Sequence, residues 1–386
     1  MSSSEPRIPL AEPYIGGNAA RYLQECLETN FVSSVGPFVT MFEDAFARAV
    51  GSRHAVACAS GTAALHLAMR VLDVGPGDEV LVPSLTFVAS ANPVRYVGAE
   101  VVLVDVEPDT YNLDPALVVA ELDARARDGR PQPAAIEVVH LLGHPADLAQ
   151  VVEAAERYGV PIVEDASEAL GATYVAGVYA GRAVGTIGRV GCFSFNGNKL
   201  ITTGGGGMLV TDDEALARRA RHLSTQARLP GLAYDHDELG YNYRLSNLAA
   251  ALGVAQLEQL DDLLAARRAI AARYDAAFGE SGSILPAPRA PWADPSFWLY
   301  TARLADPSKG ADRDRLLRAL AARGIEARPV WTPLHLTGLY RDAPRIGGSV
   351  AERIFDTALS LPSSSSLGPD QQARVLAVVH ESGERT

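Results

Sequence analysis

Residues 191–210 read GCFSFNGNKLITTGGGGMLV, and this stretch determines how the rest of the chain is interpreted. A β-rich run ends at Phe195, a turn begins at Asn196, and Lys199 follows directly. The glycines at 204–207 permit close backbone approaches that a side chain would prevent. We expect Lys199 at the ligand-binding end of a sheet, because it directly follows the turn that ends a strand. The competing interpretation is a surface lysine beside a flexible loop, which is weakened because no other lysine lies among the predicted strands.

Short β-rich runs alternate with helical runs on both sides of this stretch. The predicted strands are HAVACAS (54–60), EVLVPS (79–84), VVLVDV (101–106), AAIEVVHL (134–141), PIVEDA (161–166), VGCFSF (190–195) and GMLVT (207–211). One intervening helix, DLAQVVEAAERYG, is expected to have Asp147 as its N-cap and to end at Gly159. Repeated strand–helix–strand units predict an α/β fold with a mostly parallel, seven-stranded sheet. Such sheets bind ligands at the carboxyl ends of their strands.

The flanking segments predict an arm and a second domain. Prolines and glycines interrupt residues 1–40, which we interpret as an N-terminal arm with a short helix at 19–28. An amphipathic helix is predicted at 257–278. It is followed by a strand-like run (299–305), a helix (312–324) and a loop (360–368) before a last helix. The sequence therefore predicts a large domain at 41–260 and a smaller C-terminal α+β domain at 261–386.

Two further strand ends carry polar residues. Ser60, Gly61 and Thr62 open a helix, whose first N–H groups lack intrahelical partners and can bind a phosphate. Ser60 as a simple helix cap is the alternative, and the local pattern favours it. Asp165 ends a buried strand, where a carboxylate needs a partner. It either caps the next turn or faces a cationic ligand.

Together these residues match one cofactor. Pyridoxal phosphate needs a lysine for its Schiff base, an acid that keeps the pyridine nitrogen protonated, and a phosphate site. Lys199, Asp165 and the segment beginning at Ser60 offer these in turn, each at a strand end. Phe87, in the strand-end segment PSLTFVASAN, could stack on the pyridine ring.

The chain resembles the sugar aminotransferases of the DegT/DnrJ/EryC1/StrS family, which have the aspartate-aminotransferase fold (fold type I). The similar segments are NFVSSVGPFVTMFE (30–43), ASGTAALHLA (59–68), PSLTFVASAN (83–92), EDASEALGA (164–172), FSFNGNK (193–199), TTGGGG (202–207), GYNYRLSNLAAALGVAQL (240–257) and PLH (333–335). FSFNGNK and TTGGGG resemble the subgroup that forms 4-amino sugars on UDP-linked, N-acetylated 4-keto-6-deoxyhexoses, in the legionaminic-acid and bacillosamine pathways.

The resemblance implies roles for individual residues. Lys199 and Asp165 would be catalytic, with Asp165 on the pyridine nitrogen of the pyridoxal 5'-phosphate cofactor. The remaining cofactor-binding residues would be Ser60, Gly61, Thr62, Phe87, Glu168, Ser194, Asn196 and Asn242, the last acting on the neighbouring subunit's phosphate. Many relatives have glutamine at the position of Glu168, which would lie near the cofactor's 3-oxygen. His335 is a candidate sugar contact, with packing as the alternative.

The implied reaction has two halves. An amino donor, with glutamate expected, would leave its amine on the cofactor, and a nucleotide-linked keto sugar would then accept that amine at C4. Lys199 would move the proton between substrate and cofactor. The resemblance further implies a homodimer with shared active sites.

Composition excludes several other classes of protein. The 386 residues carry a formal net charge of −12, so no basic face is available for nucleic acid. The three cysteines show neither pairing nor metal-ligand spacing, and we expect no metal and a reducing cytoplasm. We see no secretory signal and no membrane span, and expect no membrane partner.

Three alternatives remain open from the sequence. The enzyme could aminate another ketone, such as a GDP- or dTDP-linked keto sugar or a keto-cyclitol. It could be a dehydratase of the same family, which has histidine where this chain has Lys199. It could also be a non-catalytic binding or regulatory protein, marked by loss of Lys199 or Asp165, and both are present.

Overall fold

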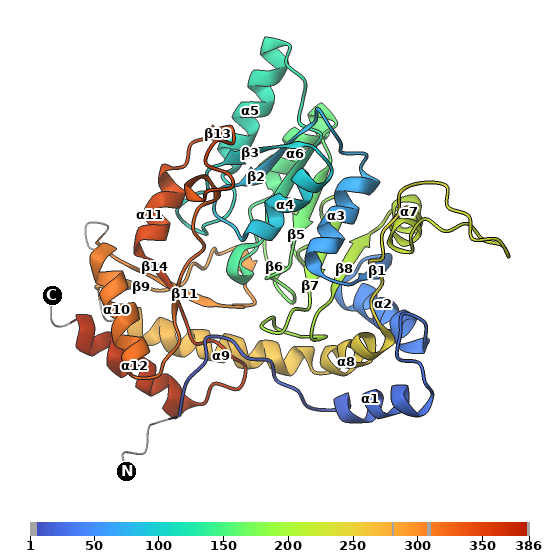
Figure 1. The fold of residues 1–386 in the computed structure, drawn as a ribbon. Coiled ribbons are helices and arrows are strands. Elements are labelled where there is room, and N and C mark those ends of the chain that lie inside the picture. Colours follow the sequence, from blue (N-terminus) through green and yellow to red (C-terminus); the bar gives the residue numbers. More distant parts are fainter. Residues whose placement is uncertain (1–5, 280–281, 307–309, 384–386) are drawn as a thin grey trace.

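A large mixed sheet forms the centre of the computed structural model, which describes residues 6–279, 282–306 and 310–383 (Figure 1). Its order is β1-β8-β7-β5-β4-β2-β3-β13, and all neighbouring pairs are parallel except those that β8 makes. The strands are β1 (His54–Cys58), β2 (Glu79–Pro83), β3 (Glu100–Val104), β4 (Ala135–Val139), β5 (Ile162–Asp165), β7 (Val190–Ser194), β8 (Gly207–Thr211) and β13 (Arg345–Ile346). The predicted α/β fold is confirmed.

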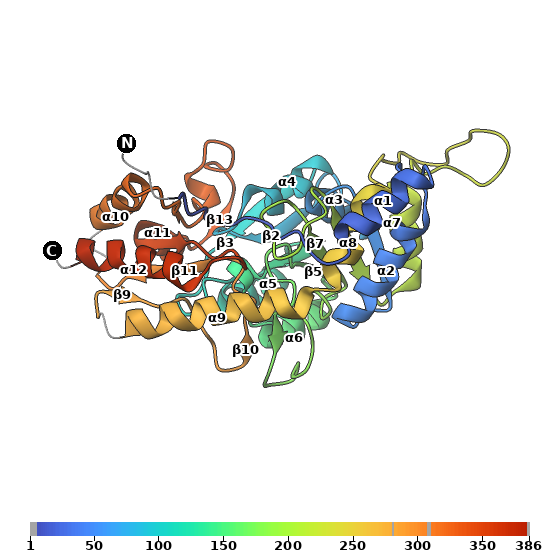
Figure 2. The same cartoon turned by 90° about the horizontal axis from the view of Figure 1, so that it is seen from below.

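Helices cover both faces of this sheet (Figures 1 and 2). One face packs against α3 (Gly61–Val71), α4 (Val88–Tyr96) and α7 (Glu214–Ser224). The opposite face packs against α2 (Pro37–Val50), α5 (Pro115–Asp128), α6 (Ala149–Tyr158) and α8 (Asn247–Leu257). The strands are therefore buried on both sides, which accounts for their nearly continuous Val, Ile and Leu content.

A second, antiparallel sheet has the order β12-β14-β11-β9. Its strands are β9 (Ile284–Leu285), β11 (Tyr300–Leu304), β12 (Arg328–Pro329) and β14 (Ala358–Leu361). The helices near it are α9 (Leu260–Gly279), α10 (Gly310–Ala322), α11 (Ser349–Thr357) and α12 (Pro369–Gly383). The first turns of α9 contribute Leu263 and Leu264 to the core of the large sheet, and its later turns contribute Tyr274 and Phe278 to the core of the small one. The boundary expected at 260/261 stays a prediction.

The remaining elements are short. Helix α1 (Ala19–Glu28) lies in the predicted arm, and β6 (Thr173–Tyr174) pairs with β10 (Ala293–Asp294). Two 3-10 turns, η1 (Leu141–Gly143) and η3 (Leu334–Leu336), follow β4 and precede β13. No helix in the described ranges has the length and apolar character needed to cross a membrane.

Three local predictions were wrong. The sheet has eight strands because the two-residue β13, too short to leave a sequence pattern, adds to its edge. The predicted helix 257–278 is divided between α8 and α9, because the Gln259 side-chain amide donates to the Ala255 carbonyl (2.9 Å), the acceptor that the next helical N–H would use. Glu258 at the break also accepts hydrogen bonds from Tyr22 and Asn18 near the start of α1. Leu148, not Asp147, occupies the N-cap of α6, although the Asp147 carboxylate still accepts from the Ala149 N–H.

Candidate active site

Lys199 projects from the loop between β7 and β8 into a pocket of about 400 Å³. The loop is fixed by Lys199 N–H donating to the Asn196 carbonyl (3.0 Å) and Thr203 N–H donating to the Phe195 carbonyl (3.0 Å). The amine lies 3.9 Å from Glu168 Oε1. Burial lowers the pKa of Lys199, whereas the charges of Glu168 and Asp165 act in the opposite direction. The lysine is thus a pocket residue, and the interpretation as a surface lysine is wrong.

Asp165 ends β5 and lines the same pocket. Its Oδ1 accepts from the Ser167 N–H (3.0 Å), and its Oδ2 accepts from the Ser90 hydroxyl (2.8 Å), which also contacts Thr86 Oγ1 (2.8 Å). The carboxylate therefore caps the next turn and faces the pocket as well. The two interpretations of Asp165 do not exclude each other.

The start of α3 forms one wall of the pocket through Ser60, Gly61 and Thr62. Ser60 is the N-cap, and its hydroxyl accepts from the Ala63 N–H (3.0 Å). The N–H groups of Gly61 and Thr62 belong to the first turn, where an intrahelical acceptor does not exist. They are free to bind an anion at the positive end of the helix.

Two glycines allow this wall to approach its neighbours closely. A Cβ on Gly61 would lie 2.8 Å from Ser194 Cβ, so Ser194 reaches the helix start only because residue 61 has no side chain. A Cβ on Gly207 would lie 2.3 Å from the Ser60 carbonyl oxygen. By contrast, a Cβ on Gly205 would meet nothing within 4 Å. The tetraglycine run is therefore tightly constrained only at its β8 end.

Aromatic rings from distant segments form another wall. Phe87, half-exposed, lies with its ring centroid 5.0 Å from that of Trp331. Trp331 in turn stacks at 6.3 Å on Trp298, which is fully buried. These three rings give a flat heteroaromatic ligand an apolar surface and reduce the access of water to the lysine.

Glu168 is held by N–H donors. Its Oε2 accepts from Leu142 N–H (2.7 Å) and its Oε1 from Trp331 Nε1 (3.2 Å). Burial raises the pKa of Glu168, and the charge of Lys199 opposes that effect. The carboxyl therefore lies close enough to Lys199 for the two charges to influence each other.

Most of the predicted site residues lie in this pocket. They are Ser60, Gly61, Thr62, Phe87, Asp165, Glu168, Ser194, Asn196 and Lys199. Sequence reasoning missed Ser90, Ser167, Trp298 and Trp331 among the lining residues. The segments ADPSFW and PVWTPLH did contain both tryptophans, but no local pattern related them to the lysine.

Two predicted site residues do not line the pocket. Asn242 is exposed on an extended segment in which Tyr241 and Tyr243 pack inward against His66. His335 is buried in η3, with Nε2 3.1 Å from Glu352 Oε1. Within this chain, Asn242 faces outward and His335 has a packing partner.

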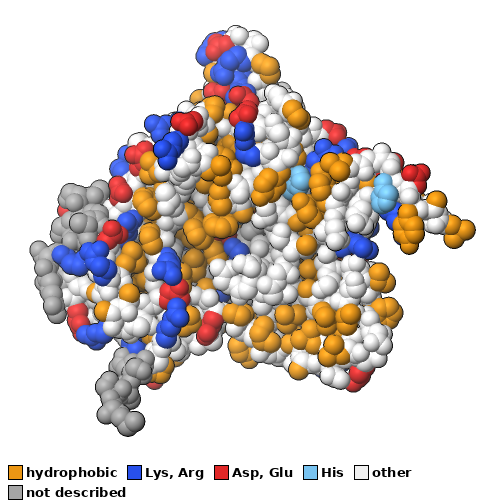
Figure 3. All heavy atoms as spheres, in the orientation of Figure 1, with side chains coloured by type: hydrophobic (Ala, Val, Ile, Leu, Met, Phe, Trp, Pro, Cys, Tyr) orange, Lys and Arg blue, Asp and Glu red, His pale blue; other side chains and the backbone are white. Residues whose placement is uncertain are grey.

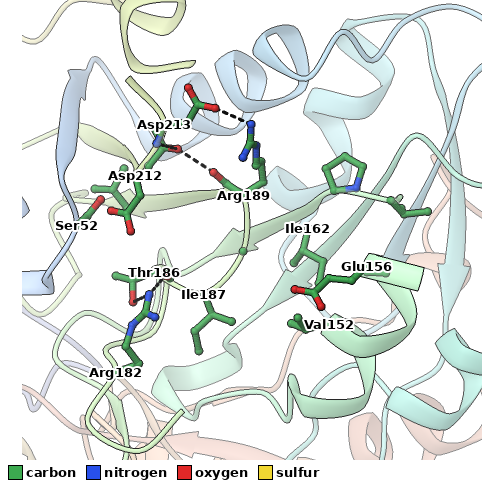
Figure 4. Close-up of a pocket in the computed structure, with 17 residues that line it drawn as sticks. Ser52, Val152, Glu156, Ile162, Arg182, Thr186, Ile187, Arg189, Asp212 and Asp213 are labelled. Atoms are coloured by element: carbon green, nitrogen blue, oxygen red, sulfur yellow. Dashed lines mark hydrogen bonds and ion pairs between the residues drawn. The ribbon is translucent and has the colours of Figure 1, made fainter. Parts of the chain in front are cut away.

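A larger hollow, of about 740 Å³, lies at the opposite end of the sheet (Figure 4). Arg189 and Asp213, which line it, form an ion pair with each other (2.6 Å), and Arg182 bonds to Thr186. Its lining residues include no lysine, and the helix start that it contains, at Asp213, is already capped by the Asp213 carboxylate, which accepts from the Ala215 and Leu216 N–H groups. The smaller pocket at the carboxyl ends of the strands has the reactive groups.

One group in the described part of the chain has metal-ligand geometry: His222, Asp237 and Glu238. It lies outside the pocket, and Glu238 already faces Arg70 and Arg219, each at 3.8 Å. We assign it no role in the site.

Comparison with known proteins gives matches over nearly the whole chain. A model of the DegT/DnrJ/EryC1/StrS aminotransferase family matches residues 13–380. A Bacillus subtilis (strain 168) protein named as pyridoxal phosphate-dependent aminotransferase EpsN is 43% identical over 377 residues, covering 97% of this chain and 95% of the relative. The GDP-perosamine synthase of Caulobacter vibrioides is 41% identical over 380 residues, covering 98% and 99%. The crystal structure of S. venezuelae DesV with a ketimine intermediate has a TM-score of 0.85 at 35% identity, covering 97% and 100%.

Proposed function

Because the chain belongs to the DegT/DnrJ/EryC1/StrS aminotransferase family, we propose that it transfers an amino group from glutamate to C4 of a nucleotide-linked 4-keto-6-deoxy sugar. It is a pyridoxal-phosphate-dependent sugar aminotransferase. The observation that carries the proposal is the convergence of an amine, an acid and an anion site, from Lys199, Asp165 and the start of α3, in one pocket.

The pocket fits the cofactor on steric and chemical grounds. The anion site at the start of α3 exists because residues 61 and 207 lack a Cβ, and it would hold the phosphate together with Thr62 and Ser194. Asp165, held in place by Ser90 and the Ser167 N–H, would keep the pyridine nitrogen protonated. Phe87 would stack on the ring. When bound, pyridoxal phosphate supplies an electron sink for the bond that breaks at the substrate carbon.

Lys199 has two roles in this proposal. It would bond the cofactor in the resting enzyme, and as a free amine it would take up and return the proton at the substrate carbon. A buried amine with a lowered pKa is suited to this role, because a larger fraction of it is unprotonated near neutral pH. Glu168 would lie beside the cofactor's 3-oxygen, where its protonation would determine whether it donates or accepts.

The nucleotide is the finer part of the proposal. Motifs FSFNGNK and TTGGGG support a UDP-linked, N-acetylated sugar. The Caulobacter relative is named for a GDP-linked amino sugar, so a GDP-linked ketone is included in the test below. His335 stays a proposed sugar contact only if its ring can be reached from the pocket, and its burial beside Glu352 favours packing.

The proposal is tested by titrating the pyridoxamine phosphate form of the enzyme with UDP-, GDP- and dTDP-linked 4-keto-6-deoxy sugars. An accepted ketone removes the amine from the cofactor, and the absorption band of the lysine-bound form returns. We expect the UDP-linked, N-acetylated ketone to give the fastest return. If no 4-keto sugar restores the band while glutamate still discharges it, the proposed acceptor is wrong.

We further propose a homodimer with shared sites. Hydrophobic side chains gather at the lower right of Figure 3, over α1 and the segments on either side of it. The exposed large ones there are Tyr14, Ile15, Leu27, Phe31, Val32, Val35 and Met41. A loop beyond α7 extends away from the body of the molecule (Figure 1) and exposes Leu232, Tyr234 and Leu239. Apolar surface of this extent is typical of an interface.

The outward direction of Asn242 fits the same proposal. Tyr241 and Tyr243 fix the segment against its own chain, and the alternation of an extended backbone then directs Asn242 away from it. A residue so placed can serve the site of a second subunit. A cytoplasmic location is also proposed, in keeping with three buried cysteines that are all unpaired.

A further inference from the structure

The amine of Lys199 lies on the face of an indole ring. Its Nζ is 3.6 Å from the ring centroid of Trp298, well inside the range in which an ammonium is attracted to an aromatic face. Glu168 Oε1, at 3.9 Å, is farther than a hydrogen bond. Trp298 is therefore the nearest described partner of the amine.

The ring is held in place from three directions. Trp298 Nε1 donates to the carbonyl of Asn198 (2.7 Å). Asn198 is the residue next to Lys199, so this bond fixes the ring and the lysine loop together. The backbone carbonyl of Trp298 accepts from Arg267 of α9, and the indole ring of Trp298 stacks on that of Trp331. The hydrogen bond to the Asn198 carbonyl satisfies the buried indole N–H and fixes the orientation of the ring relative to the lysine loop.

We propose that Trp298 is a positioning residue that receives the amine of Lys199 whenever the amine is not bonded to the cofactor. The ring face attracts the ammonium form and aligns the amine at a defined place in the pocket. Trp298 thereby sets the ease with which Lys199 gives up its proton. The inference deepens the proposed function, since the free amine is the group that moves the proton.

The other groups that act on the amine charge are few. Glu168 and Asp165 both favour the ammonium, and burial disfavours it. The ring adds to the carboxylates, so its removal should lower the pKa of Lys199. Loss of packing would shift the pKa of Lys199 in the opposite direction, because water entering the site would favour the ammonium and raise that pKa. A role in positioning and a role in packing therefore predict opposite shifts.

The test is the pH dependence of acylation of Lys199 in the full-length, cofactor-free protein. The chain has two lysines, Lys199 and Lys309, which lie in different tryptic peptides, so mass spectrometry can follow each one. We expect Trp298→Leu, which removes the aromatic face, to lower the midpoint for Lys199, with about two- to ten-fold faster labelling at a fixed pH below it. A change in the access of the acylating reagent would alter the labelling rate reached at high pH, but it would leave the midpoint of the pH dependence unchanged.

Trp292→Leu is the matched control, since Trp292 stacks on Tyr174 and does not line the pocket. Its midpoint should equal that of the wild type. A midpoint for Lys199 that rises or stays constant in Trp298→Leu overturns the proposal. Because turnover is not measured, an incorrect sugar substrate in the proposed function leaves this result unaffected.

A second measurement keeps Trp298 intact in case its replacement prevents folding. In Trp292→Phe/Trp331→Phe, the emission of the remaining indole should change with pH at the midpoint found for Lys199. Adding Lys199→Met should abolish that change. Emission that does not titrate, or that titrates without the lysine, shows that the amine does not act on the ring.

Discussion

Replacing Asp165 by asparagine separates its two functions, because the structure allows the amide to keep nearly all the local hydrogen bonds. The amide oxygen can accept from the Ser167 N–H as Oδ1 does now. The amide nitrogen can donate to Ser90 Oγ, which then donates to Thr86 Oγ1 instead of Asp165. The net change is one exchanged hydrogen bond, about 1 kcal/mol or less of folding free energy.

The charge, however, is lost completely. A neutral amide cannot keep the pyridine nitrogen protonated, and removing a proton-controlling group lowers turnover by about 10²–10⁴-fold. The variant should therefore unfold within a few degrees of the wild type while being badly impaired in amino transfer from glutamate.

The assay pairs thermal unfolding with the rate at which glutamate discharges the lysine-bound cofactor. Ser90→Ala is the control, because it removes the hydrogen bond to Oδ2 and keeps the carboxylate. It should retain most of the activity. Near-normal turnover of Asp165→Asn would refute the reasoning, since Asp165 would then be only a cap of the turn before Ser167.

Four further outcomes are expected. Borohydride should fix the cofactor on the peptide containing Lys199, and Lys199→Ala should retain some cofactor but lose turnover; labelling of the other lysine would contradict the assignment. Mixed dimers of Lys199→Ala and Asn242→Ala subunits place both lesions in one site, so they should approach half the normal number of active sites; verified hybrids no better than the average of the parents would exclude shared sites. Phe87→Ala should impair turnover less than Asp165→Asn, because stacking is lost while the charges remain. Burial lowers the pKa values of His66 and His144 to about 4, so these histidines bind protons in the unfolded chain before they do in the folded one. The free energy of unfolding should therefore fall as the pH is lowered from 6.5 towards 5. Denaturant titration should find this pH dependence reduced in His66→Gln/His144→Gln.

The parts of the site that follow strand ends could be predicted from the sequence. Lys199, Asp165 and the Ser60 segment are each read from a strand followed by a turn or a helix, and parallel strands bring their carboxyl ends together. The predicted strands appeared for the same reason, since runs buried on both faces have a distinctive composition.

The contacts made by distant segments could not be predicted. Trp298 and Trp331 enter the pocket from segments next to strands β11 and β12 of the small sheet, about a hundred residues or more after Lys199 in the sequence. At the break between α8 and α9, Glu258 bonds to Tyr22 and Asn18, and neither is local to it. Such features follow from tertiary packing, which overrides the helical preference of the residues concerned.

The tetraglycine run has a consequence for anyone who diversifies this enzyme. Its positions differ sharply in tolerance. Gly205 has open space and lines the pocket, so a small side chain there would change the room left for the ligand. Gly204, at φ +79°, suits asparagine better than a branched residue. Gly206 would bring a new Cβ within 2.3 Å of the Thr203 hydroxyl, so it requires that side chain to move. Gly207 abuts backbone that cannot move without displacing the start of α3. A library should vary the first two positions and leave the last fixed.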